Sequence, residues 1–284
     1  MPGNKMLEKN NNLKIGELPE LHMVGLNDVV LHEDPDMERV ARLVDRFSAD
    51  GILKNPPVAG RSKGHRRIIL DGANRVTALR KLGYSHVLVQ ELDLFDPDLS
   101  IGTWHHAIER LDADELLEHA AGIPGVRLME EEGEPVSSVP DLARFHLPNG
   151  RVVSLTGADG LDDRVIQLHK LTKVYHRFAY FDRVSYTNME DLVRNYRNFT
   201  ALLTFRPFTL EDLQQLTHWD RRVPSGVTRI LLPKRALRFN LQLEMLRAGL
   251  SVEEKEEWLQ QTILEKVGDK SIRFYREPTF FFDE

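Results

Sequence analysis

The sequence predicts an α/β (α+β) protein in which an N-terminal α/β unit precedes a second mixed α/β domain. Apolar β-branched runs alternate with segments of helical periodicity along the chain, without an internal repeat. The 284 residues, 41% of them hydrophobic, are enough for two modest domains or one large one, each with its own core. We expect a flexible leader over 1–20, a first unit over 21–98 and a second unit over 99–284, with the boundary at Asp96-Pro97-Asp98.

Local signals define the first unit. Apolar residues recur at helical spacing from Val40 to Phe47, and Gly51 ends that helix. Pro56 disfavours the α conformation in the residue before it, so the chain becomes extended there. The expected elements are a strand over 21–34 that leads into an acidic turn, a helix over 36–49, an extended segment from 55, a strand over 65–71, a helix that closes at 83 and a strand over 87–95.

The second unit mixes strands and helices, which argues against a helical bundle. Asn149-Gly150 lies between two apolar runs and predicts a β-hairpin over 143–157. Thr209 and Asp212 have capping-box spacing, and Ser251 is a second N-cap. The other expected elements are helices over 112–123, 161–178, 209–219 and 251–268, a loop over 130–139, a strand over 198–208, a strand, Pro turn and extended chain over 226–240, and a β-like end over 272–284.

The stretch from Ile68 to Gly83 is typical of a phosphate site. An apolar strand ends in Asp71-Gly72, and a helix then begins at once. Free N–H groups at a helix start, together with the helix dipole, favour an anion. Gly72 lets the backbone approach that anion, and Arg75 can offer a bidentate fork. The spacing matches neither the P-loop nor the Gly-x-Gly-x-x-Gly turn.

Asp-Gly-x-x-Arg before a short helix, preceded by Asn-Pro-Pro-Val, resembles the ParB/sulfiredoxin superfamily. Sulfiredoxin chemistry needs a Cys in this turn, and the chain has none. ParB proteins carry a helix-turn-helix domain, for which no downstream pattern is convincing. The chain is most similar to the free-serine kinase branch, which includes the archaeal ADP-dependent enzyme and the bacterial SbnI type. The resemblance implies a ParB/sulfiredoxin-like nucleotide-binding domain followed by a substrate domain. Ala73 and Asn74 depart from the archaeal pattern, where His is common.

Two carboxylates are the candidate catalytic residues. From the residues alone, Glu33 is more simply an acid that stabilises a helix start. The resemblance implies instead that Glu33 is the general base, with Asp34 as a neighbouring candidate. Asp71 is either a turn-forming residue or a group that binds Mg²⁺ or orients the serine hydroxyl. The turn residues expected to hold nucleotide phosphates are Gly72, Ala73, Asn74 and Arg75.

The serine-binding residues are expected in the second unit. The resemblance implies that Trp104 and His105 line the serine pocket, although the sequence does not distinguish His105 from His106. An Arg neutralises a carboxylate bidentately, so Thr228 and Arg229 are expected to hold the amino acid. Lys234 and Arg235 after Pro233 add positive potential near the phosphates. Adjacent His residues do not share a helix face, which argues against a zinc site.

Composition excludes several classes of protein. The absence of Cys excludes a disulfide scaffold and is consistent with a cytoplasmic protein. No apolar run approaches the roughly 18 residues that a membrane span needs. The formal net charge of −6 argues against nucleic acid as a partner, and the basic run from Arg61 to Arg67 is typical of a solvated loop. Phe280–Phe282 is either core or a subunit contact, which leaves a homodimer open.

Together these features predict a Mg²⁺-dependent kinase that transfers a phosphoryl group from ATP or ADP to free L-serine, giving O-phospho-L-serine. Glu33 and Asp71 would be its catalytic residues. The alternative is a ParB-like, nucleotide-dependent DNA-binding or transcriptional regulatory protein. A third reading is a ligand-binding regulator that kept the fold and lost catalysis.

Overall fold

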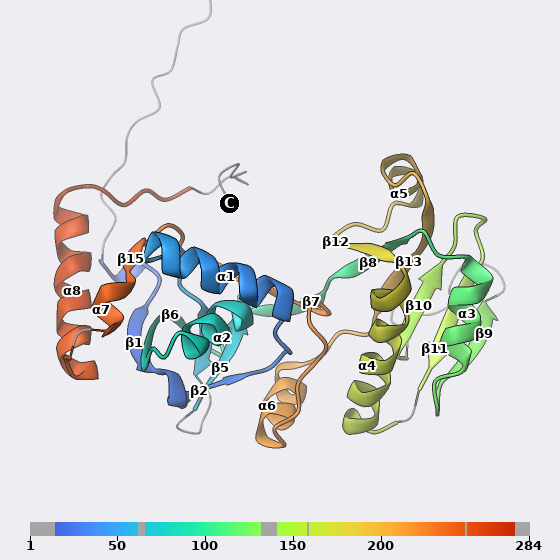
Figure 1. Cartoon of the computed structure of the whole chain (residues 1–284), viewed down its shortest axis with the longest axis horizontal. Helices are drawn as coiled ribbons and strands as arrows, with labels where there is room; N and C mark the ends of the chain where they lie inside the picture. Colours follow the sequence, from blue (N-terminus) through green and yellow to red (C-terminus); the bar gives the residue numbers. More distant parts are fainter. Residues whose placement is uncertain (1–14, 62–65, 132–140, 158, 248, 276–284) are drawn as a thin grey trace, which may run out of the picture.

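The structure is a computed structural model that describes residues 15–61, 66–131, 141–157, 159–247 and 249–275 (Figure 1). Within these residues, the first unit is built on a five-stranded mixed sheet. In spatial order its strands are β1 (Leu21–Gly25), β6 (His86–Asp93), β4 (Val58–Arg61), β5 (Arg67–Asp71) and β2 (Val29–Leu31). β4–β6 and β2–β5 are parallel pairs, and the other two are antiparallel.

The single strand expected over 21–34 is in fact two strands. A short 3-10 turn at Leu26–Asp28 separates β1 from β2. This turn lets the chain cross the sheet, so that β1 and β2 form its opposite edges. Apolar periodicity alone does not show such an interruption, because buried apolar residues occur in the strands on both sides of the turn.

Two helices of the first unit begin as predicted. α1 (Met37–Asp50) is capped by Asp36, whose carboxylate accepts from the N–H groups of Glu38 and Arg39. It ends at Gly51, which has a φ of 65°. α2 (Ala73–Lys81) begins directly after Gly72, which has a φ of 99° and makes no side-chain cap.

The second unit contains a six-stranded antiparallel sheet among the described residues. Its strands, in spatial order, are β12 (Tyr180–Val184), β8 (His105–Glu109), β13 (Phe199–Phe205), β10 (Ala143–His146), β11 (Val152–Thr156) and β9 (Arg127–Glu131). β10 and β11 pair in the predicted hairpin, with Gly150 at its tip at a φ of 86°.

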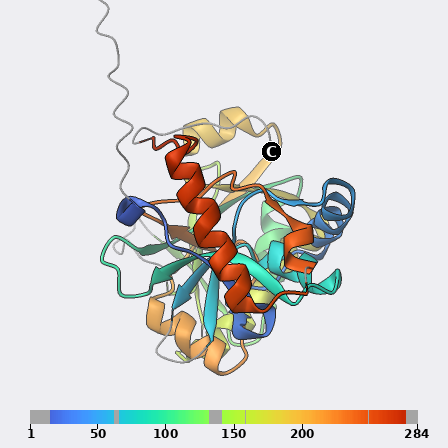
Figure 2. The same ribbon diagram turned by 90° about the vertical axis from the view of Figure 1, so that its left-hand side faces the viewer.

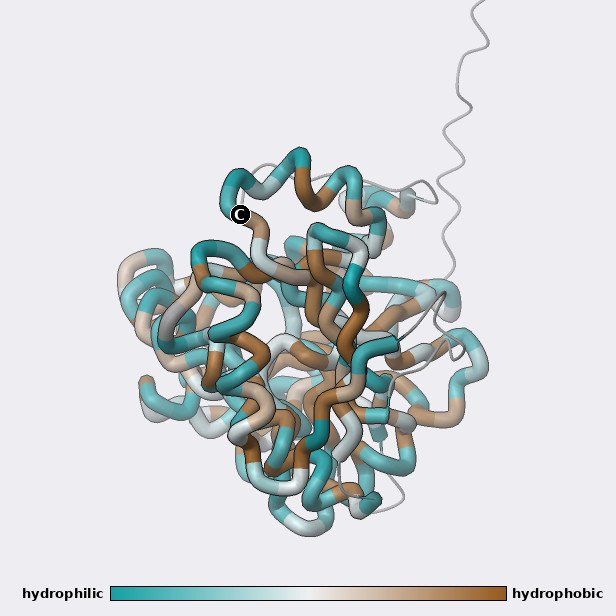
Figure 3. The backbone as a smooth tube through the Cα atoms, turned by 90° about the vertical axis from the view of Figure 1, so that its right-hand side faces the viewer, coloured by the Kyte–Doolittle hydropathy of each residue, from teal (hydrophilic) through white to brown (hydrophobic). Residues whose placement is uncertain are grey.

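The helices of the second unit are α3 (Ala113–Ala121), α4 (Leu161–Phe178), α5 (Met189–Asn195) and α6 (Leu210–His218). The Thr209–Asp212 capping box of α6 is present as predicted. Figure 3 shows hydrophobic and hydrophilic stretches alternating along the tube on this side of the molecule, as expected where one face of a helix packs on a sheet.

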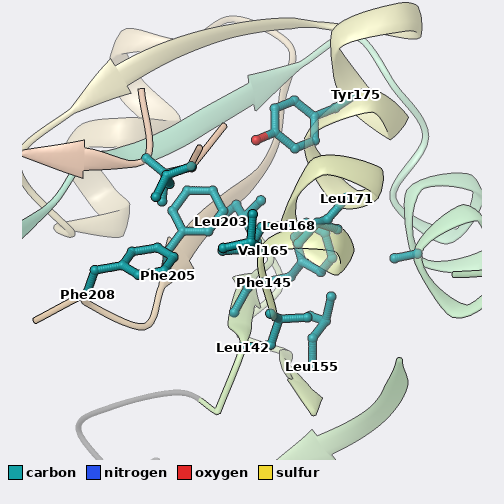
Figure 4. Close-up of a cluster of buried hydrophobic side chains, with 14 of the residues drawn as sticks. Leu142, Phe145, Leu155, Val165, Leu168, Leu171, Tyr175, Leu203, Phe205 and Phe208 are labelled. Carbon is teal, nitrogen blue, oxygen red and sulfur yellow. The ribbon is translucent and has the colours of Figure 1, made fainter. Parts of the chain in front are cut away.

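The main core joins the two units. Figure 4 shows its centre, where Val165, Leu168 and Leu171 of α4 face Phe145 and Leu203 of the sheet. The same cluster takes Ile68 and Leu70 from β5, whereas Ile69 between them belongs to the first unit's own core. Alternate residues of β5 therefore serve two cores, which explains its continuous apolar run.

A two-stranded ribbon connects the units. β7 (Ser100–Thr103) leads from the first unit to the second, β14 (Thr228–Leu231) leads back, and the two pair antiparallel. Thr228 lies opposite Thr103, and Arg229 lies opposite Gly102.

The chain then returns to the first unit. β15 (Leu241–Gln242) pairs with β3 (Ile52–Leu53), and α7 (Leu243–Arg247) and α8 (Val252–Gly268) follow. Leu241, Leu246 and Leu259 lie in the core of the first unit, and Figure 2 shows α8 crossing in front of that unit. β15, α7 and α8 therefore pack with the first sheet, and the boundaries at 20 and 98 stay a prediction.

The β-like end expected over 272–284 is wrong for residues 272–275, which form no strand. Residues 276–284, including Phe280–Phe282, lie outside the described residues. Residues 1–14 and 132–140 also lie outside them. No helix in the described ranges has the length and hydropathy to cross a membrane.

Candidate active site

Glu33 lies where the first unit meets a turn of the second. It follows β2 and forms an isolated parallel bridge with Val223. Asp34 donates its N–H to the carbonyl of Val223 at 2.9 Å. The N–H of Gly226 donates to Oε2 of Glu33 at 3.2 Å. A backbone donor thus fixes the carboxylate at the end of a buried strand.

An arginine that sequence analysis missed lies beside this turn. A Cβ on Gly226 would lie 2.0 Å from Nε of Arg183, so the guanidinium packs directly on the glycine. Gly226 also has a φ of 79°, which favours glycine. Burial and the charge of Arg39 lower the pKa of Arg183, and the Glu33 carboxylate opposes that shift. Arg183 comes from β12, more than forty residues from Gly226, so no local motif signals it.

His106 supports the same turn through a hydrogen bond to its backbone. Burial lowers its pKa to about 3, so the ring is neutral at ordinary pH. Its Nε2 donates to the carbonyl of Gly226 at 2.9 Å, and its Nδ1 accepts from the hydroxyl of Tyr175 at 2.5 Å. His106 is fully buried. Of the two adjacent histidines, the structure therefore gives His106 the task of holding the turn.

A second buried histidine ties the ribbon to the first sheet. Nδ1 of His32 donates to the carbonyl of Ile69 at 2.6 Å, and Nε2 meets the Thr228 hydroxyl at 2.8 Å. Thr228 and His32 are both buried. The Thr228 side chain is therefore engaged inside the protein, next to the strand that carries Glu33.

Three of the predicted serine-site residues lie together. The guanidinium of Arg229 sits over the Trp104 ring, 4.7 Å from its centre. Burial lowers the pKa of His105, and the nearby Arg229 lowers it further. Nδ1 of His105 is a buried atom without a hydrogen-bond partner in the structure. Because Thr228 and Arg229 are consecutive on a strand, their side chains point to opposite faces, and Thr228 does not join this group.

The phosphate turn is held by ion pairs. Arg75 donates to Oδ2 of Asp71 at 2.7 Å and to the carbonyls of Asn55 and Pro56 at 2.7 and 3.2 Å. Arg235 donates to the same Oδ2. Burial would raise the pKa of Asp71, but the two guanidiniums outweigh it and the pKa is lowered.

The space around position 72 requires a glycine. A Cβ there would meet the Cβ of Pro57 at 2.9 Å and Nη2 of Arg75 at 3.0 Å. The side-chain oxygen of Asn74 accepts a hydrogen bond from the N–H of Asp36 at 2.8 Å, and this bond joins the starts of α1 and α2. Ala73 is buried and can offer only its backbone to a ligand.

These contacts group the predicted residues into three clusters. Glu33 meets the 225–226 turn, Asp71 meets Arg75 beside Gly72, and Trp104 meets Arg229. The first cluster offers a proton acceptor, the second offers free helix N–H groups to an anion, and the third offers a cation to a carboxylate. The roles of these residues stay predictions.

Known proteins resemble this chain in sequence and in fold. An ATP-dependent L-serine kinase, SbnI of Staphylococcus aureus, is 23% identical over 265 residues, which cover 93% of this chain and 97% of that protein. An ATP-dependent L-serine kinase of Staphylothermus marinus is 27% identical over 116 residues, covering 39% of this chain and 44% of that protein. No protein-family model matches the chain.

Two solved structures share the fold. SbnI from Staphylococcus aureus with a C-terminal truncation superposes with a TM-score of 0.69 at 20% identity, covering 86% of this chain and 96% of that one. A free serine kinase in complex with AMP superposes with a TM-score of 0.67 at 19% identity, covering 80% and 93%. The chain is therefore a relative of the SbnI-type L-serine kinases over nearly its whole length and has the fold of the free serine kinases.

Proposed function

We propose that the protein is a free L-serine kinase that transfers a phosphoryl group from ATP or ADP to the serine hydroxyl, giving O-phospho-L-serine. The observation that carries the proposal is the Glu33 carboxylate, which the Gly226 N–H holds at the end of β2. The sequence relationship to L-serine kinases supports the same activity.

Glu33 would act as the general base. It accepts the hydroxyl proton as the serine oxygen attacks the terminal phosphorus, and the bond to the leaving nucleotide breaks. Arg183 beside Gly226 adds positive charge near the reacting oxygens. Asp34, which follows Glu33, is the alternative base.

The phosphate turn would hold the nucleotide. The free N–H groups at the start of α2 point outward from Gly72, and the helix dipole favours an anion there. Asp71 orients Arg75 and Arg235 through Oδ2, so the turn has net positive charge around one carboxylate. Phosphate groups complement that charge.

Mg²⁺ fits this site only together with nucleotide. The lowered pKa keeps Asp71 ionised, as a metal ligand must be, but both neighbouring guanidiniums oppose a lone cation. The described residues contain no cluster of three His, Cys, Asp or Glu that could hold a metal. Mg²⁺ would neutralise phosphate charge when bound, with Asp71 as its protein ligand.

Serine would bind between the Glu33 turn and the Trp104–Arg229 pair. Arg229 neutralises its carboxylate, and His105 lies beside this pair with a buried, unpartnered Nδ1 that can meet a polar group of the substrate. Thr228 acts indirectly, through its bond to His32. We also expect the enzyme to act in the cytoplasm.

The test is a nucleotide-consumption assay with Mg²⁺, with ATP and ADP in separate reactions and phosphoserine detected by mass spectrometry. Serine should stimulate consumption, whereas alanine should not, because it lacks the hydroxyl nucleophile. Nucleotide turnover that ignores serine, together with tight and salt-sensitive binding to duplex DNA, would favour the ParB-like reading instead.

A further inference from the structure

A polar recess lies along the open edge of β2, and its lining includes none of the residues of the phosphate turn. One wall is the segment from Leu26 to Leu31, and the other is the segment from Thr217 to Arg222 that follows α6. Its volume is about 240 Å³. Figure 1 shows α6 beside this end of the first unit. β2 is an edge strand, so no neighbouring strand of its sheet covers this side.

Arginines dominate the lining of this recess, which we call the arginine recess. They are Arg66, Arg80, Arg221 and Arg222. Asp162 pairs with Arg221 at 2.7 Å. Asp220 lies 4.0 Å from Arg222, but its side chain is 96% exposed, so water screens this pair. Four guanidiniums against these two carboxylates leave an excess of two positive charges.

Hydrogen bonds to the backbone hold the Arg80 guanidinium in place among these positive charges. Its Nη2 donates to the carbonyls of Leu26 and Val29, each at 2.8 Å. Burial lowers the pKa of Arg80, and the charge of Arg222 lowers it further. Like charges are therefore held together, and a bound anion would relieve their repulsion.

We propose that the arginine recess binds a phosphate dianion, either free phosphate or the phosphate group of a small phosphomonoester. The planar guanidinium fork matches phosphate oxygens bidentately, and two excess charges match a dianion. The recess is smaller than the roughly 300 Å³ at which pockets for larger ligands begin, so a whole nucleotide does not fit.

The arginine recess connects directly to the Glu33 turn. The carbonyl of Arg222 accepts from Nε2 of His169 at 2.9 Å, and the next residue, Val223, bridges to Glu33. An anion that draws the Arg222 side chain inward therefore acts on the segment that positions the carboxylate. This makes the recess a regulatory site, a role that rests on the proposed kinase function.

Isothermal titration calorimetry tests the site itself. Inorganic phosphate and O-phospho-L-serine are titrated separately into protein whose nucleotide site is saturated with ADP. The double variant Arg66→Glu/Arg222→Glu should bind roughly tenfold to a hundredfold more weakly, since a charged hydrogen bond contributes about 1.5–3 kcal/mol. The exposed Arg197, remote in sequence and absent from the lining, provides a matched control as Arg197→Glu. Unchanged ADP affinity and melting temperature verify that the double variant folds.

Tighter binding of O-phospho-L-serine than of phosphate assigns the recess to phosphomonoesters only where the double variant loses that advantage. An advantage that the double variant keeps belongs to the proposed serine pocket, and equal binding of the two probes assigns the recess to free phosphate. Equal affinity in the wild type and the double variant overturns the site, as does the absence of binding to the wild type. Steeply salt-dependent binding of duplex DNA that is lost in the double variant overturns it in favour of nucleic acid.

Serine-dependent turnover tests the regulatory role. Phosphate should change wild-type turnover, and the double variant should lose that part of the response. A response that persists in the double variant belongs to the nucleotide site and overturns regulation through the recess. Arginine-dependent phosphate binding without any serine kinase activity would reject the proposed function and leave the binding site standing.

Discussion

The backbone N–H of Gly226 donates to Oε2 of Glu33 at 3.2 Å, and this contact joins a turn of the second unit to the end of β2 in the first. Two residues 193 positions apart in the sequence thereby fix the position of the Glu33 carboxylate. Its placement depends on His106 and Arg183, which both contact Gly226.

The Glu33→Gln variant separates proton transfer from geometry. The Gln side-chain oxygen still accepts from the Gly226 N–H, but the amide is not a base. Turnover should fall by roughly 10² to 10⁴, with AMP affinity nearly unchanged. Steady-state phosphoserine production and calorimetry measure the two quantities. Near-normal turnover would move the base to Asp34 or Asp71.

Gly72 and Gly83 form a matched pair for testing the phosphate turn. Both have a positive φ, of 99° and 76°, but a Cβ on Gly83 meets nothing within 4 Å. Each Ala substitution should cost about 1–2 kcal/mol from the left-handed backbone alone. Only Gly72→Ala should also displace Pro57 and weaken nucleotide binding. Urea unfolding and AMP titration provide the comparison, and equal AMP affinity in both variants would argue against this turn as the phosphate site.

Arg75 contributes to the same turn through its side chain. The Arg75→Ala variant removes the ion pair to Asp71 and two bonds to backbone carbonyls. Nucleotide affinity should fall by roughly tenfold to a hundredfold, as expected for a charge-assisted contact of about 1.5–3 kcal/mol. AMP titration measures it. Wild-type affinity would show that Arg75 only braces the loop.

His106 predicts a pH dependence of stability. Its pKa is about 3 in the folded protein, against about 6.5 for an unfolded chain. Between these values the unfolded state binds a proton that the folded state does not, so stability falls as pH drops below about 6.5. The slope from this group is at most about 1.4 kcal/mol per pH unit.

The His106→Gln variant keeps an amide donor for the Gly226 carbonyl and removes this titration. Urea unfolding at about pH 7, 6 and 5 should show a shallower loss of stability than in the wild type. The exposed His218 provides the control substitution, His218→Gln. Parallel slopes for wild type and His106→Gln would mean that His106 is protonated in the folded protein.

Substitution of Arg229 should change the KM for serine, whereas substitution of Thr228 should change the stability of the fold. Arg229→Ala should raise the KM for serine by roughly tenfold or more, because it removes the cation for the carboxylate. Thr228→Val has the same shape but leaves His32 without its partner, which should cost about 1–3 kcal/mol of stability. Kinetics and urea unfolding distinguish the two effects. A larger rise in KM for Thr228→Val would place the hydroxyl on the substrate.

Local signals predicted the parts of the fold that depend on nearby residues. The Asp71-Gly72 turn, the caps at Thr209 and Ser251 and the hairpin at Gly150 all follow from short patterns, and the structure confirms each of them. A cap or a tight turn is determined by residues within a few positions, so the sequence displays it directly.

Long-range packing could not be predicted in this way. Arg183 reaches Gly226, and His32 reaches Thr228, only because separate strands meet in the folded chain. The return of Leu259 to the first core depends on the whole path of the chain after residue 231. The apolar periodicity of α8 shows that this helix buries one face, but it does not show which sheet that face packs against.

The paired strands β7 and β14 have a mechanical consequence. The chain passes between its two units twice, and hydrogen bonds fasten the two passages into one strap. A single passage would swivel about its bonds, whereas a strap resists twisting and bends mainly across its flat face. Because the units also share the main core, relative motion of the units would have to bend this strap and displace that core together. Arg229 belongs to the strap and Trp104 directly follows it, so the residues proposed to grip serine move with the bend itself.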